Sequence, residues 1–201
     1  MSASPDYFQL LRQYTAEALA GGSCPGLYGD PESKENILVA FKTGEAMTSD
    51  FSGTLKCIFD PEEPTTPLPT FFMSPAWITT RAFSEFLRSL NVTDFEVFPV
   101  EIRNTLTGQT HRDYVLLNVT KSISCAHLQA SQTRSLGGDL VVVDRLVIDD
   151  ALVENQSPDI FVAAEDTDII VVHERIQEAL IEKGFPDIAF QKLEKKSSHI
   201  R

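Results

Sequence analysis

The sequence lacks any apolar run near the roughly 20 residues that span a bilayer, and its start lacks a positive segment followed by a long apolar one. Cysteines are few as well: Cys24, Cys57 and Cys125 are widely spaced, which is typical of reduced thiols and not of a disulfide framework. We therefore expect a cytoplasmic protein with no membrane partner.

Basic residues are also scarce. The 201 residues include 17 Lys and Arg against 29 Asp and Glu, for a formal net charge of -12. A chain with this charge repels phosphate backbones, which argues against nucleic acid as a partner and favours a basic protein. The apolar content of 42% is enough for one sizeable core.

Motifs for metals are missing too. No CxxC occurs, and the spacing of the four histidines fits no set of ligands. His173-Glu174 opens like the HExxH zinc helix, but Gln177 stands where the second histidine is needed. We therefore predict that His173 caps a helix, and that the protein holds neither a metal nor a cofactor.

The N-terminal portion shows one helix signal and two strand signals. Ser4-Pro5-Asp6 is typical of a helix start and predicts a helix that ends at Gly21-Gly22. Strands are predicted at 36–42 and 54–60. Four prolines within 61–69 exclude a helix or a central strand there. The sequence thus predicts a subdomain of residues 1–65 followed by a domain of residues 66–201.

The remaining chain alternates strand and helix patterns. The stretch 78–91 carries a helical apolar stripe that ends at Asn91, and the stretches 95–104 and 111–123 predict a hairpin with Gly108 in its turn. Residues 139–149 predict a nearly continuous apolar strand of the kind that is buried on both faces. A strand and a helix that ends at Gly184 follow. These patterns predict an α+β fold, mainly antiparallel sheet with a few packed helices.

Two of these stretches match each other. Residues 78–100 align on 171–193 with a constant offset of 93, without a gap, so that Phe83 falls on Ile176, Leu87 on Leu180 and Asn91 on Gly184. This correspondence predicts two related strand-helix-strand units in the C-terminal part, packed on a shared sheet.

Cys125 and His127 are the candidate catalytic pair. If the strand that begins at Arg112 keeps its period of two, Cys125 shares an apolar face with Leu117 and Val119 and points into the core. A buried thiol holds little thiolate and is a poor nucleophile. Packing is thus the favoured interpretation, and a hydrolase that uses Cys125 and His127 is the alternative.

The sequence feature that still indicates a function is the distribution of charge. Between residues 139 and 168 lie nine acidic residues and a single basic residue, Arg145. A solvated surface would account for this surplus, and so would a docking face for a basic partner. We predict that the face which binds the partner includes Asp149, Asp150, Glu154, Glu165, Asp166 and Asp168.

The order of these segments resembles a known family. The stretches FPVEI, DYVLLNVTKSISCAHLQAS, DRLVIDD and PDIFVAAEDTDIIVVHERIQEALIEKGFPDIAF, within residues 66–193, are similar to the eleventh family of predicted immunity proteins from bacterial polymorphic toxin systems. His173 departs from the serine usual at that helix start, and Phe185-Pro186 departs from a glycine-rich turn.

The resemblance implies a protein that is not an enzyme, an antidote that covers a cognate toxin domain. If that toxin is a nuclease with a basic cleft, the acidic face would stand in for phosphates. A structural or adaptor protein of a secretion apparatus, such as a type VI system, is a further alternative.

Overall fold

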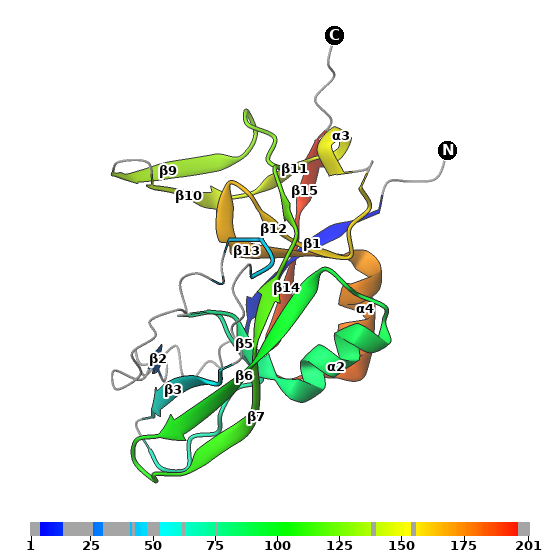
Figure 1. Cartoon of the computed structure of the whole chain (residues 1–201). Coiled ribbons are helices and arrows are strands. Elements are labelled where there is room, and N and C mark those ends of the chain that lie inside the picture. Colours follow the sequence, from blue (N-terminus) through cyan, green and yellow to red (C-terminus); the bar gives the residue numbers. More distant parts are fainter. Residues whose placement is uncertain are drawn as a thin grey trace.

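The computed structural model describes residues 5–13, 26–29, 41, 43–47, 53–61, 63–74, 76–137, 140–153 and 156–196. Its strands form two large sheets and two short pairs, and two helices lie next to each other on one side of the molecule (Figure 1). The predicted α+β class with mainly antiparallel pairing is confirmed. Within the described ranges, no helix has the length and apolar character needed to cross a membrane.

The larger sheet has six strands. In spatial order they are β2 (Gly26–Gly29), β3 (Leu55–Asp60), β6 (Phe95–Asn104), β7 (Thr110–Val119), β5 (Ile78–Thr80) and β4 (Phe71–Phe72). Only β3 and β6 pair in parallel. The predicted β6–β7 hairpin is confirmed, with Gly108 in its turn at a φ of 71°. β3 also confirms the strand predicted at 54–60, whereas of the strand predicted at 36–42 only the buried Phe41 is described.

The second sheet has five strands and corrects one prediction. Their order is β14 (Ile188–Lys192), β1 (Tyr7–Arg12), β13 (Asp166–His173), β12 (Ile160–Ala163) and β8 (Ser122–Ile123). The helix predicted from Pro5 is wrong over Tyr7–Arg12, because β1 hydrogen-bonds on both edges, to β13 and to β14. Tertiary pairing thus overrides the local helix signal. From residue 14 on, the predicted helix lies outside the described residues.

Two short strand pairs complete the sheet structure. β9 (Gln132–Gly137) and β10 (Leu140–Arg145) form a hairpin that extends away from the large sheets in Figure 1, and β11 (Val147–Asp149) pairs in parallel with β15 (Glu194–Lys196). The prediction of one strand buried on both faces at 139–149 is wrong. The strand is interrupted at Leu146, between β10 and β11, and Asp144 and Arg145 are exposed. The helix α3 (Asp150–Val153) follows β11.

The predicted internal repeat appears in the backbone. α2 (Arg81–Ser89) and α4 (Glu174–Lys183) begin after N-cap residues Thr80 and His173, which lie 93 positions apart and have φ/ψ of −67°/148° and −68°/149°. Asn91 and Gly184 end these units with positive φ values of 61° and 73°. The offset of 93 found in the sequence therefore relates the two N-cap residues and also the two residues of positive φ that follow the helices.

The strand registers repeat with the same offset, but the units do not share a sheet. β5 and β6 flank β7, and β13 and β14 flank β1. Leu116 lies opposite Ile78 and Phe98. Gln9 lies opposite Val171 and Gln191, which are the positions 93 residues further on. The prediction of a shared sheet is wrong, because each unit encloses its own middle strand and so builds a sheet of its own.

The core joins the two sheets. One buried cluster takes side chains from both helices and both sheets, including Leu10, Leu87, Leu117, Ile170 and Leu180. Two further clusters cover the outer faces. β1 and β3 come from before residue 66 and belong to different sheets, so each sheet combines strands from both sides of the predicted boundary. The division at residue 65 stays a prediction.

Candidate functional site

Cys125 lies in the core, as predicted, but in a different part of it. Its side chain is completely buried and packs in the cluster of Ile123 and Phe161. Leu117 and Val119 belong to another cluster, because β7 ends at Val119 and β8 joins the second sheet. The prediction that Leu117, Val119 and Cys125 share one strand face is therefore wrong, while the burial of Cys125 is confirmed.

The surroundings of this thiol do not suit a nucleophile. Burial raises the pKa of Cys125 well above its usual range, and the nearby Glu165 carboxylate raises it further. The Sγ lies 3.9 Å from Glu165 Oε2, so the neutral thiol donates to the carboxylate. His127 Nδ1 is buried and has no hydrogen-bond partner that would orient the ring. The geometry gives the hydrolase alternative no support.

The raised thiol pKa predicts a loss of stability in alkali. Because the folded state holds the proton more tightly than the unfolded chain, the stabilisation is complete below the unfolded pKa of about 8.5 and is lost as pH rises toward the folded value. Above pH 9 we expect the free energy of unfolding to fall by up to ~1.4 kcal/mol per pH unit through this group. Urea titrations at pH 7.5, 9 and 10 measure this slope.

The matched variant is Cys125→Ala, whose unfolding free energy should be lower at pH 7.5 by about 1 to 2 kcal/mol but should decline less steeply between pH 9 and 10. Burial also raises the pKa of the Tyr7 hydroxyl, to about 12, but Tyr7 is present in both proteins, so its alkaline contribution cancels in this comparison. Equal alkaline slopes in the two proteins would contradict the assignment to Cys125.

Glu165 holds the segment that contains Cys125. Its carboxylate accepts hydrogen bonds from Ser124 Oγ at 2.8 Å, from the Ala126 N–H at 3.0 Å and from the Cys125 N–H at 3.4 Å. Hydrogen bonds to an ionised acceptor are stronger than neutral ones. Glu165 is therefore an anchor for its own chain, a role that sequence reasoning missed because the two segments lie 39 to 41 residues apart.

Two more of the predicted partner-binding residues bind the backbone of this chain. Asp166 accepts from the Val143 N–H at 3.0 Å and from the Asp168 N–H at 3.1 Å. Asp149 is only 4% exposed and accepts from the Ala151 N–H at 3.1 Å, at the start of α3. These carboxylates position loops in the way that Asp side chains do at turns and helix starts.

The predicted acidic residues thus fall into two neighbouring groups. Glu165, Asp166 and Asp168 lie at the β12–β13 turn, and Asp149 and Asp150 lie where β11 meets α3. The groups meet at Cys125, whose N–H donates to Glu165 and whose carbonyl accepts from the Asp149 N–H at 2.8 Å. Asp168 is exposed and Asp150 is half-buried, and Glu154 lies outside the described residues.

Other acidic residues nearby are paired with bases. Arg134 Nε lies 2.9 Å from Asp144, and the Arg175 guanidinium binds Asp159.

His173 caps α4, as predicted, since its Nδ1 accepts from the Arg175 N–H at 3.1 Å. An imidazole nitrogen thus does here what a serine hydroxyl does at an N-cap. In the described part of the chain, no three His, Cys, Asp or Glu residues group as a metal site requires.

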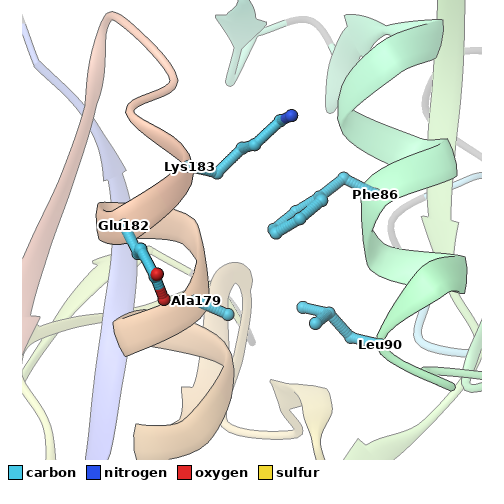
Figure 2. Close-up of a pocket in the computed structure, with 5 residues that line it drawn as sticks. All are labelled: Phe86, Leu90, Ala179, Glu182 and Lys183. Atoms are coloured by element: carbon cyan, nitrogen blue, oxygen red, sulfur yellow. The ribbon is translucent and has the colours of Figure 1, made fainter.

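A hollow of about 420 Å³ separates the two long helices (Figure 2). It is lined by Phe86, Leu90, Ala179, Glu182 and Lys183, and Figure 2 shows Phe86 and Leu90 reaching from α2 toward α4. The Lys183 ammonium lies 5.7 Å from the centroid of the Phe86 ring. Three apolar and two charged residues thus line this hollow.

Asn118 is a buried polar residue to which sequence reasoning gave no role. Its Nδ2 donates to the Glu45 carbonyl at 2.9 Å and to Glu96 Oε2 at 3.2 Å, and the same Oε2 accepts from the Met47 N–H at 3.0 Å. Asn118 and Glu96 therefore fasten segment 43–47 to the β6–β7 hairpin. A sequence signal for this role was a polar residue within the apolar second half of β7.

Comparison with known proteins now gives the family. Residues 10–195 match the model of the immunity protein family Imm11, a span that includes parts of both sheets and both long helices. A search of curated proteins finds no match to this chain. Since the matched span covers nearly the whole sequence, the chain belongs to the Imm11 immunity protein family, which supports an immunity role.

Proposed function

We propose that this protein binds a cognate toxin domain of a bacterial polymorphic toxin system and blocks it by covering its active cleft. The observation that carries the proposal is the family match over residues 10–195, which implies a toxin as partner. The net charge of -12 favours a toxin with a basic surface. The cytoplasm, where a buried thiol such as that of Cys125 stays reduced, is the proposed compartment.

Within this proposal, the acidic face consists of the carboxylates at the β12–β13 turn and at the start of α3. Asp149, Glu165 and Asp166 hold these loops in place; Asp168 is exposed and Asp150 is half-buried. If the toxin is a nuclease, its cleft must be basic to bind the phosphate backbone, and exposed carboxylates would occupy the positions of phosphates. Steric cover and charge complementarity would then act together.

The test is co-expression with the toxin domain encoded next to the gene of this protein. The full chain should restore growth of cells that express the toxin, and purified chain should bind an inactive variant of the toxin in a calorimeter. Growth arrest that is unchanged by the chain, together with no measurable binding, would reject the proposal. Turnover of a substrate by the purified chain would support the hydrolase alternative instead.

Charge reversal tests the acidic face. The double variant Asp150→Lys, Asp168→Lys should associate with the toxin domain about tenfold more slowly at low ionic strength and with a weaker salt dependence, because complementary charge acts mainly on the association rate. Stopped-flow mixing at several salt concentrations measures both quantities. Asp149, Glu165 and Asp166 stay unchanged, since their removal would disturb the loops.

The matched control is Glu85→Lys, Asp113→Lys, which changes the net charge equally at exposed positions on α2 and β7. We expect the control to slow association less than about threefold, through long-range charge alone. Equal rates for the two double variants would place the interface elsewhere on the surface.

A further inference from the structure

The segment 124–131 is a loop whose backbone is fixed from several sides. Glu165 accepts hydrogen bonds from its first residues, as described above. At its other end, Ser131 Oγ accepts from the Val147 N–H at 3.0 Å and donates to the Val147 carbonyl at 3.2 Å. The same carbonyl accepts from the His127 N–H at 2.7 Å. The loop is therefore held against β11 and against the β12–β13 turn.

The tip of this loop is also closed on itself. The His127 carbonyl accepts from the Ala130 N–H at 3.0 Å and from the Ser131 N–H at 2.9 Å. These bonds span Leu128 and Gln129 and leave both side chains in solvent. Leu128 is 86% exposed, the largest exposed fraction among the large apolar side chains of the described residues.

A single exposed leucine needs no explanation by itself. Here, however, the exposed side chain stands on a backbone that hydrogen bonds have already ordered. Binding through such a side chain immobilises little further, so most of the gain from burying it is kept as affinity. The loop thus combines an apolar anchor with a preorganised support.

The charges next to the loop indicate the chemistry of the partner. Glu165, in the β12–β13 turn, contacts the loop directly. Asp166 and Asp168 lie at the start of β13, and Asp166 also accepts from the Val143 N–H of β10. An apolar centre with a charged rim is the usual anatomy of a protein interface. The complementary surface is an apolar pocket about the size of a leucine side chain, bordered by Lys and Arg.

We infer that Leu128 is the apolar anchor by which this protein docks on its toxin, inserted into a pocket that basic side chains surround. The inference rests on the proposed function and adds to it a named contact residue and the chemistry of the toxin surface. The rim carboxylates steer the approach, and Leu128 sets the lifetime of the complex, because loss of a buried contact acts mainly on the dissociation rate.

The test compares Leu128→Asp with Leu106→Asp in the full-length chain. Leu106 is 50% exposed and lies in the β6–β7 turn, whereas the 124–131 loop follows the other end of β7, about 30 Å away along that strand. Both variants add one negative charge on an exposed turn. Both variants should have melting temperatures within a few degrees of that of the unmodified protein. A change in binding could then not be attributed to unfolding.

We expect Leu128→Asp to weaken binding of the inactive toxin domain by at least 100-fold, mainly through faster dissociation, and to abolish growth rescue. The milder Leu128→Ala should weaken binding by about 10-fold to 100-fold, and Leu106→Asp should bind within about threefold of the unmodified chain. If the unmodified chain binds and rescues but Leu128→Asp does so equally well, the anchor is wrong and the proposed function stands. If the unmodified chain neither binds nor rescues, the proposed function itself fails.

Discussion

Gly44→Ala is expected to lower the free energy of unfolding by about 3 kcal/mol, or roughly 6 to 12 °C in melting temperature. A Cβ at this position would lie 2.4 Å from Val162 Cγ2 and 2.7 Å from Ser122 Cβ, closer than real Cβ atoms come. The φ of +73° adds backbone strain for any residue with a side chain. Segment 43–47 would have to move away from β8 and β12, and the bonds of Asn118 and Glu96 to that segment would weaken. Differential scanning calorimetry measures the change.

Gly108→Ala is the matched control for this experiment. Its φ is +71°, nearly the same as that of Gly44, but nothing lies within 4 Å of the added Cβ. It should therefore show only the backbone term of about 1 kcal/mol. The difference between the two variants isolates the steric cost at the contact with β8 and β12. Equal destabilisation of both would mean that segment 43–47 does not approach the sheet as closely as the structure shows.

Local signals in the sequence were enough to predict the two long helices and the central hairpin. α2 and α4 each bury one stripe, are preceded by a residue that caps the first turn, and are followed by a residue of positive φ, Asn91 or Gly184. Each signal therefore lies within its own segment. The repeat offset could be found for the same reason, because capping and periodicity recur at corresponding positions. What the offset could not show is that each unit encloses a different third strand.

The predictions for β1 and for the strand through Ile123 were wrong because non-local contacts determine these strands. The sequence of β1 is typical of a helix start, yet its paired residues in β13 and β14 lie 162 to 184 positions away, and no local pattern identifies them. The strand predicted through Ile123 breaks because β8 pairs with β12 in the other sheet. Strand choice depends on partners that a window of ten residues does not contain.

Non-local contacts also limit what the sequence can predict about the charged residues of the candidate site. The sequence reveals how many carboxylates lie between residues 139 and 168, but not which of them the backbone uses. Glu165 and Asp166 have exposed neighbours in the sequence, yet each accepts hydrogen bonds from segments more than 20 residues away. The remaining charge toward solvent is therefore smaller than the count implies. In the proposed docking face, the exposed Leu128 at the loop tip would supply the apolar contact.

A chain that begins at residue 66 is expected not to fold cooperatively, although the proline-rich stretch before it has the composition of a linker. It would lack β1, and both β13 and β14 would lose the strand that lies between them. It would also lack β3, which pairs with β6. Backbone groups at the centre of a sheet would then lack hydrogen-bond partners, which is costly. The core would also be open on one side, so the remaining buried apolar surface would be too small to offset the entropy lost in ordering the chain.

The measurement is thermal unfolding followed by near-UV and far-UV circular dichroism, with Leu10→Ala in the full chain as a graded comparison. Leu10 is 1% exposed and packs in the cluster that joins both sheets, so this variant should fold and lose about 2 to 5 kcal/mol of unfolding free energy. A chain of residues 66–201 that melts in one sharp transition near that of the intact protein would show that the boundary at residue 65 separates independent folding units. A broad, featureless melt would show instead that β1 completes the fold on which the proposed toxin-binding loops depend.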